Sequence, residues 1–172
     1  TVGAGIPFYY VFGNHDNEKG RKLLTSTAGI HLTEATSPVG NSSVNLRGVD
    51  HSGQSFPTTA PDISINALFR KNVLIIHESP HPIVDCSGSL LYQNDSNRVD
   101  ICPYIESADF DIDLLVTGHL HVADQPRVRN HDIPVLVTGP TVPISSYEKA
   151  SNPSTWLLTA TNSGINLERQ PV

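Results

Sequence analysis

The chain has 172 residues, a net charge of -6 and 38% hydrophobic residues, with 12 glycines and 13 prolines. These values suit one turn-rich globular domain over residues 1–172 and exclude a disordered chain. No apolar run approaches the roughly 18 residues of a membrane span, and the acidic balance gives no general attraction for nucleic-acid phosphates. We therefore expect a soluble protein without a membrane partner. The cytoplasm is favoured as its location, and nucleic acid is possible as a substrate but not indicated by charge.

The N-terminal part is predicted to alternate strand and helix. The apolar run at residues 7–12, PFYYVF, predicts a buried strand that ends at Gly13. A short helix is expected at residues 18–26. A half-buried strand is expected at 43–50, where apolar and polar residues alternate. Residues 51–61 have the composition of a loop.

The middle of the chain contains the most continuous apolar run. Residues 62–69 fit a short helix with an aspartate near its N-terminus, where a carboxylate is favourable. The run NVLII at residues 72–76 is rich in β-branched residues and predicts a strand that is covered on both faces. A long polar loop is expected at 80–103, followed by a helix at 104–112.

The C-terminal part is predicted to consist of strands. Residues 114–117 and 134–138 predict two further buried strands, and residues 155–161 and 164–168 predict a closing hairpin. A chain that mixes helices with buried strands in this way is expected to form an α/β layered fold.

Polar residues rich in histidine follow three of the predicted strands. They are Asn14-His15-Asp16, His77-Glu78 and Gly118-His119-Leu120-His121. In α/β sheets, ligands bind outside the carboxyl ends of the strands. We therefore expect these three segments to contribute to one functional site.

The segment Gly118-His119-Leu120-His121 has the residue types of a metal site. Two histidines at positions i and i+2 of an extended segment project to the same side. Neutral imidazole is a frequent ligand of Zn, Fe, Mn and Ni. Gly118 allows a sharp turn where a Cβ would obstruct it. Taken alone, the segment also fits two loop histidines without a partner.

The segment Gly13-Asn14-His15-Asp16 places three polar side chains on a tight turn. An asparagine oxygen can bind a metal, and a neighbouring histidine can give a proton or a hydrogen bond to a substrate oxygen. The alternative is an Asx turn that caps the following helix. For His77, the alternative is a core histidine that bonds to the backbone.

Together and in this order, the three segments resemble the last three signature blocks of the calcineurin-like metallophosphoesterase superfamily. The resemblance covers roughly residues 7–140, and residues 133–140 are similar, less specifically, to a segment that follows the last block. It implies a layered α-β-β-α sandwich, in which two β-sheets pack together with helices outside. It also implies that a dinuclear centre of two divalent ions, such as Mn, Fe or Zn, hydrolyses a phosphate monoester or diester.

The resemblance implies a metal ligand at four positions. Asn14, His77 and His119 would bind the second metal of the pair, and His121 would reach the first. Two divalent ions about 3.5–4 Å apart neutralise a phosphoryl group, lower the pKa of a bridging water and hold the attacking and leaving oxygens in line. Such a site does not need a basic protein surface, which agrees with the acidic net charge.

The resemblance also implies roles for the remaining residues of these blocks. His15 would lie over the substrate phosphate, where it would stabilise the transition state and assist the leaving group. Asp16 would support its turn rather than take part in catalysis. Gly13 and Gly118 would support the turns in which the ligands lie.

The sequence departs from the family at its first two blocks. The patterns Asp-x-His and Gly-Asp-x-x-Asp, which supply most ligands of the first metal and the bridging carboxylate, do not occur in the 172 residues. We expect the chain to be the C-terminal portion of a longer enzyme, N-terminally incomplete, with only part of the metal cage. One alternative is a non-catalytic binding module of the same fold. Another is a single metal bound by His77, His119 and His121. The sequence indicates no oligomeric state.

The other histidines and the cysteines are not assigned to the site. His31, His51 and His131 fall in predicted surface segments and are expected to be solvated. The alternating residues Asp109, Asp111 and Asp113 are expected to form a solvated approach to a strand rather than a calcium site. Cys86 and Cys102 either form one disulfide or remain free thiols.

Overall fold

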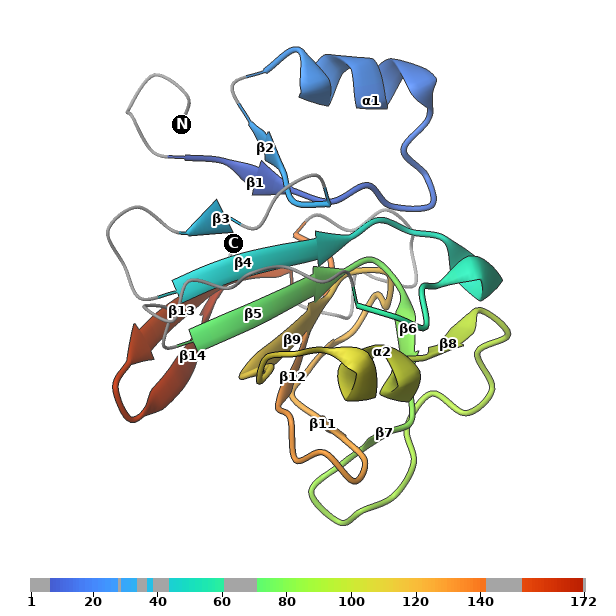
Figure 1. Cartoon of the computed structure of the whole chain (residues 1–172), viewed down its shortest axis with the longest axis vertical. Helices are drawn as coiled ribbons and strands as arrows, with labels where there is room; N and C mark the ends of the chain where they lie inside the picture. Colours follow the sequence, from blue (N-terminus) through green and yellow to red (C-terminus); the bar gives the residue numbers. More distant parts are fainter. Residues whose placement is uncertain are drawn as a thin grey trace.

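The computed structural model describes residues 7–27, 29–33, 37–38, 44–60, 71–141 and 153–171. The fold is mixed α/β with mostly strands, which confirms the predicted class at that level (Figure 1). The predicted helix at 62–69 lies outside the described residues. Within these ranges, no helix is both long and apolar enough to cross a membrane.

A six-stranded sheet lies at the centre of the molecule. Its strands are β3 (Ser37–Pro38), β4 (Val44–Val49), β5 (Lys71–Ile76), β9 (Leu114–Thr117), β10 (Ala123–Asp124) and β12 (Val135–Thr138). Their order in the sheet is β10-β12-β9-β5-β4-β3. The four inner strands are parallel, and the two edge strands run antiparallel to their neighbours. The predicted strands at 43–50, 72–76, 114–117 and 134–138 are therefore confirmed.

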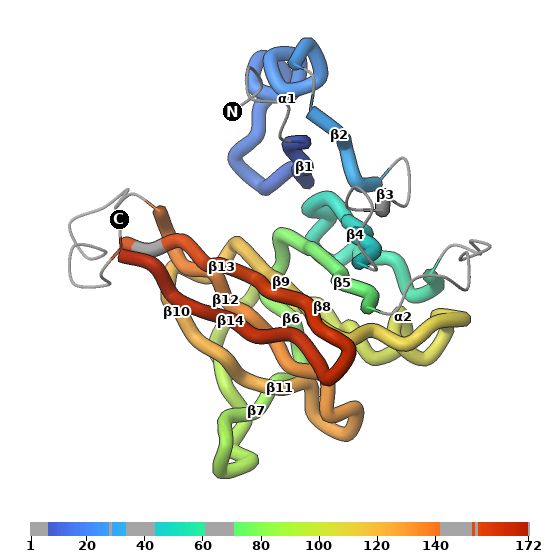
Figure 2. Tube along the Cα trace, turned by 90° about the vertical axis from the view of Figure 1, so that its left-hand side faces the viewer, coloured from blue at the N-terminus to red at the C-terminus, as the bar shows by residue number. Residues whose placement is uncertain are grey.

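Both faces of the sheet are covered (Figures 1 and 2). The covering elements are helix α2 (Cys102–Ser107) on one face and the hairpin of strands β13 (Ser154–Thr161) and β14 (Gly164–Pro171) on the other. Leu74 and Ile76 belong to the core that contains Tyr104 of α2. Val73 belongs to the opposite core, against which Trp156 of the hairpin packs. Because its side chains enter both cores in turn, β5 is a continuous apolar run in the sequence. The prediction of a closing hairpin near the C-terminus is also confirmed.

An N-terminal layer packs beyond β4 (Figure 1). It consists of β1 (Tyr9–Tyr10), helix α1 (Glu18–Thr25) and β2 (Ile30–His31), and the two strands pair in parallel. The helix is as predicted, but the predicted strand at 7–12 is only two residues long. The layer approaches β4 closely at Gly48, where a Cβ would lie 2.6 Å from that of Leu32.

The prediction of one long loop at 80–103 is wrong. The segment contains strands β6 (Ser79–His81), β7 (Ile83–Val84) and β8 (Arg98–Asp100). Strand β6 pairs with β8, and β7 pairs with β11 (Arg127–Val128). Strands of two or three residues show no hydrophobic period, so composition alone suggests a loop. A short 3-10 helix, η2 (Gly53–Ser55), likewise interrupts the predicted loop at 51–61.

Helix α2 also differs from its predicted position at residues 104–112. It begins at Cys102, with a proline in its first turn, and ends at Ser107 because Ala108 is extended. Proline is favourable at the first turn of a helix, where its missing N–H has no partner to lose. Cys102 and Cys86 are both free thiols, so the disulfide alternative is excluded.

Candidate metal-binding site

The carboxyl ends of β4, β5 and β9 lie at one level of the sheet. Val49 of β4 is in register with Ile76 of β5, which is in register with Thr117 of β9. Each is the last residue of its strand, so the chain leaves the sheet at the same edge three times. A histidine follows within two residues in each case: His51 after β4, His77 after β5 and His119 after β9.

These three residues form a group of imidazoles that we call the histidine cluster. The ring centres of His77 and His119 are 5.4 Å apart, those of His51 and His119 are 5.8 Å apart, and those of His51 and His77 are 6.3 Å apart. His77 and His119, together with His121, line a pocket of about 340 Å³. The polar residues after two predicted strands, β5 and β9, therefore meet at one place.

Asn14 reaches the cluster from the N-terminal layer. Its Oδ1 lies 3.1 Å from Nε2 of His77. The alternative role of a helix cap belongs to Asn17, whose side chain accepts a hydrogen bond from the N–H of Gly20. Two ligand atoms that bind one ion at about 2.0–2.1 Å lie about 3–3.4 Å apart. In the structure this pair is hydrogen-bonded, and the same spacing would suit two ligands of a shared metal.

Two glycines make room for the ring of His77. A Cβ on Gly13 would lie 2.9 Å from Cε1 and Nε2 of the ring, and a Cβ on Gly118 would lie 2.8 Å from Nδ1. Real Cβ atoms do not approach neighbours this closely. The predicted role of both glycines was to allow turns, and the structure adds a steric reason for each.

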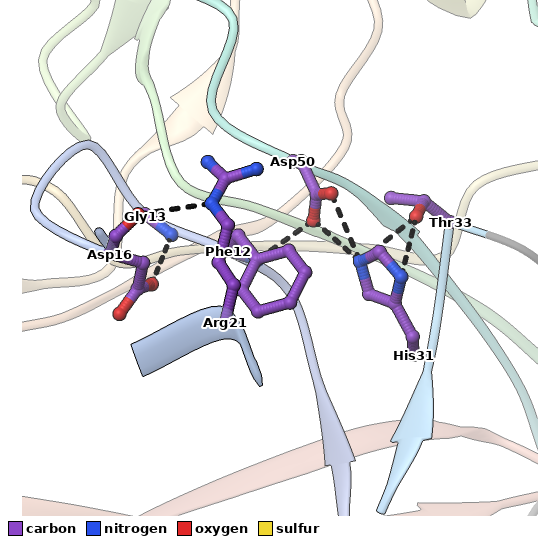
Figure 3. A network of polar contacts seen from close by, with 7 residues as sticks. All are labelled: Phe12, Gly13, Asp16, Arg21, His31, Thr33 and Asp50. Atoms are coloured by element: carbon purple, nitrogen blue, oxygen red, sulfur yellow. Dashed lines mark hydrogen bonds and ion pairs between the residues drawn. The ribbon is translucent and has the colours of Figure 1, made fainter. Parts of the chain in front are cut away.

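The turn that carries Asn14 is held by Asp16 (Figure 3). The carboxylate of Asp16 accepts a hydrogen bond of 2.6 Å from the N–H of Gly13, and its backbone N–H donates to the Gly13 carbonyl at 3.2 Å. Arg21 of helix α1 donates from Nε to the Asp16 carbonyl at 3.0 Å. His15 is exposed on this turn, and in the described part of the chain it makes no hydrogen bond or ring contact with the cluster.

Asp50 ties the same turn to the end of β4 (Figure 3). Its Oδ1 accepts hydrogen bonds from the N–H of Phe12 at 2.7 Å and from Nε2 of His31 at 2.9 Å. The expectation that His31 is solvated is therefore wrong, and its side chain is only 11% exposed. The ring of Tyr10 stacks on His31 with centres 5.2 Å apart.

The expectation that His51 is solvated is also wrong. Its Nδ1 lies 3.0 Å from Oε2 of Glu78 and 3.1 Å from the carbonyl oxygen of His77, and the carbonyl is the better aligned of the two acceptors. Glu78 is fully buried. The sequence signal for His51 was present, because it follows a predicted strand end just as His77 and His119 do.

His77 and His119 are neutral near pH 7. Burial, together with the neighbouring rings of His119 and His51, lowers the pKa of His77 to about 4. Burial also lowers the pKa of His119. A neutral imidazole keeps a lone pair that a metal ion can bind. His119 adopts a φ of +23°, a left-handed conformation that is costly for residues other than glycine and is often found at functional sites.

The donor set fits a divalent transition metal, since neutral imidazoles and an amide oxygen both bind such ions. In this conformation, no three His, Cys, Asp or Glu side chains among the described residues stand in a coordinating arrangement. Metal binding would therefore require the rings to move closer together. The structure gathers Asn14, His77, His119 and His121 but does not bring His15 to them.

Of the other residues that were predicted to lie at the surface, some form ion pairs or hydrogen bonds and others are exposed. The expectation that Asp113 is solvated is wrong. Its carboxylate pairs with Nζ of Lys71 at 2.7 Å and accepts a hydrogen bond from the N–H of Asn72 at 2.8 Å. Asp109 and Asp111 are exposed. His131 is half-buried and lies 3.8 Å from Glu106.

Comparison with known proteins gives no assignment for the chain. No protein family model matches it, and no curated protein matches its sequence. Function is therefore inferred from the geometry and the donor chemistry of the cluster.

Proposed function

We propose that the chain carries part of the dinuclear metal centre of a phosphoesterase that resembles the calcineurin-like metallophosphoesterases. The substrate would be a phosphate monoester or diester. One observation supports this most: potential ligands from three separate blocks, spread over residues 14–121, come together at the carboxyl edge of a parallel sheet. A chance distribution of loop histidines would not place them at one sheet edge.

The proposed ligands divide between two metal ions. Asn14, His77 and His119 would hold one divalent ion, and His121 would reach the other. When bound, the two ions would activate a water molecule and neutralise the phosphoryl charge. The carboxylates that complete such a centre are absent from the 172 residues, so they would come from another part of the parent protein.

His15 is the proposed substrate-contacting residue. It follows Asn14 directly on the turn that Asp16 holds, and its side chain is exposed. From this turn it would donate a hydrogen bond to a phosphate oxygen and a proton to the leaving group. Asp16 acts only on the turn in this proposal, because its carboxylate is already bonded to the N–H of Gly13.

The arrangement of layers supports the proposed α-β-β-α sandwich. Helix α2 covers one face of the six-stranded sheet, and the hairpin β13–β14 lies against the other face as a further layer of strands (Figure 2). In the proposed fold, this hairpin belongs to the second sheet. Further helices would lie outside it.

The proposal is tested by hydrolysis in a protein that includes the coding sequence upstream of Thr1. The substrates are p-nitrophenyl phosphate and bis-p-nitrophenyl phosphate, assayed with and without Mn²⁺. We expect metal-dependent hydrolysis, and a loss of at least about 100-fold in kcat for His119→Ala, because a metal ligand is removed. His131→Ala is the matched control and should keep its activity. Unchanged metal-dependent hydrolysis in His119→Ala would contradict the proposal.

The alternative of a non-catalytic binding module is favoured by one observation. Neither Asp-x-His nor Gly-Asp-x-x-Asp occurs in the 172 residues. The coding region upstream of Thr1 separates the two functions. If both blocks are present there, the enzyme is supported. If the complete gene lacks both, the binding module is supported instead.

A further inference from the structure

A buried carboxylate lies beneath the histidine cluster. Glu78 is 0% exposed, and its Oε1 accepts hydrogen bonds from the N–H groups of Ser52 at 2.6 Å and Gly53 at 2.9 Å. Its Oε2 faces Nδ1 of His51 at 3.0 Å. A buried carboxylate is costly unless its oxygens have polar partners. Three consecutive residues of the loop after β4, residues 51–53, therefore contact Glu78, and His51 among them belongs to the histidine cluster.

The surroundings of His51 fix its tautomer. The two groups within hydrogen-bonding distance of Nδ1, the Glu78 carboxylate and the His77 carbonyl, are both acceptors. The proton of the neutral ring therefore lies on Nδ1, and the lone pair lies on Nε2. Histidines that bind metals nearly always donate their other ring N–H to a carboxylate or a backbone carbonyl. His51 Nδ1 is hydrogen-bonded to the His77 carbonyl, and the Glu78 carboxylate lies beside it as an ion-pair neighbour whose Oε2 has no other hydrogen-bond partner among the described residues.

The spacing of the three rings is close to that of ligands on one ion. Three imidazoles bound to a tetrahedral metal have ring centres about 5 Å apart. The corresponding distances in the cluster are 5.4, 5.8 and 6.3 Å. His77 is confined by Gly13 and Gly118, so closure of the triangle requires movement of His51 and His119.

We propose that His51, His77 and His119 together bind one divalent transition-metal ion within this chain, and that Glu78 orients His51 for this role. Three neutral imidazoles and an open fourth position form a known type of zinc site. The inference rests on the proposed function in taking His77 and His119 as metal ligands. It differs by adding His51 and by requiring neither His121 nor the absent carboxylates.

The test is a Co²⁺ titration of the 172-residue chain. Tetrahedral Co²⁺ absorbs visible light much more strongly than the aqueous ion, so the spectrum reports both binding and geometry. We expect one ion per chain. His51→Gln should weaken binding at least about tenfold, and Glu78→Gln about 10–100-fold, the usual effect of losing the carboxylate behind a ligand. His131→Gln is the control and should bind as the wild type does.

A fourth variant separates this inference from the proposed function. We expect His121→Gln to weaken Co²⁺ binding less than His51→Gln does, because His121 is not among the three ligands of this ion. If it weakens binding while His51→Gln does not, the His51 site is overturned and the dinuclear proposal remains. If the wild-type chain binds no Co²⁺, the His51 site is also overturned, and the hydrolysis assay on the longer protein decides the proposed function separately.

A second measurement covers the case in which His51→Gln does not fold. The side-chain ¹⁵N signals of the wild-type histidines are recorded with and without Zn²⁺. We expect the Nε2 signal of His51 to move to a metal-bound value, together with one nitrogen of His77 and one of His119. An Nε2 signal of His51 that does not move while Zn²⁺ binds would overturn the inference.

Discussion

His77 is the residue on which the contacts of the site converge. Asn14 meets its Nε2, two glycines border its ring, and its carbonyl accepts a hydrogen bond from His51. The apolar run before it predicted that it ends a strand. The glycine contacts were not predictable, because they depend on how far apart in space residues 13, 77 and 118 lie. Sequence reasoning placed these residues at turns and could not show that they share one small volume.

The contact with Gly118 gives a stability prediction. Gly118→Ala places a methyl group against the His77 ring, and we expect it to destabilise the fold by about 1–3 kcal/mol, as overpacking does. Gly20→Ala in helix α1 is the matched control. Its Cβ would meet its nearest neighbour at 3.8 Å, so the change should be neutral or stabilise by up to about 1 kcal/mol. Urea denaturation measures both. Equal stability of the two variants would show that the ring is not confined as described.

The lowered pKa of His77 gives a pH prediction. Burial, with the neighbouring rings of His119 and His51, lowers this pKa from 6.5 to about 4 in the folded chain. Between these values the unfolded chain binds more protons than the folded one, so stability falls as the pH falls from 6.5 to 4. His119 acts in the same direction. In urea denaturation with EDTA, wild type should lose more stability between pH 7 and pH 5 than His77→Gln. Identical losses in both proteins would contradict this assignment.

The strands show which secondary-structure elements could be predicted from the sequence and which could not. Strands β5, β9 and β12 were predicted because each is a short, continuous apolar run buried on two faces. Their neighbours and register depend on pairing between residues far apart in sequence. His51 was missed although it follows a predicted strand, because nothing local shows that β4 lies beside β5, in register with it at Val49 and Ile76. The short strands β6, β7 and β8 are likewise stabilised by distant partners.

The hairpin β13–β14 provides a matched pair of leucines. Leu158 packs against the core of Val73 and Leu136, whereas its neighbour Leu157 points to the other side and is 52% exposed. Leu158→Ala should destabilise the fold by about 1–3 kcal/mol, because it removes partly buried apolar area. Leu157→Ala should change stability by less than about 0.5 kcal/mol. Thermal or urea unfolding measures the difference. A larger loss for Leu157→Ala would mean that the hairpin presents its opposite face to the sheet.

At the scale of the whole molecule, the site joins two parts of the fold. The central sheet supplies the histidine cluster, and the N-terminal layer supplies Asn14 and His15. Asp50 links the two by accepting hydrogen bonds from Phe12 and His31. The three segments resemble the signature blocks of a family in their order along the chain, and this resemblance predicted that Asn14 would lie near His77 and His119. The links that hold the layer in place were not predicted, since His31 reads as an ordinary surface residue.

The central claim is that the carboxyl edge of this sheet binds a divalent metal ion. The most direct measurement is anomalous diffraction from crystals of the chain grown with Zn²⁺. We predict a peak about 2.0–2.3 Å from ring nitrogens of His77 and His119. Asn14 Oδ1 or Nε2 of His51 would complete the ligands. A histidine cluster without an anomalous peak, in crystals where Zn²⁺ binds elsewhere on the chain, would contradict the account.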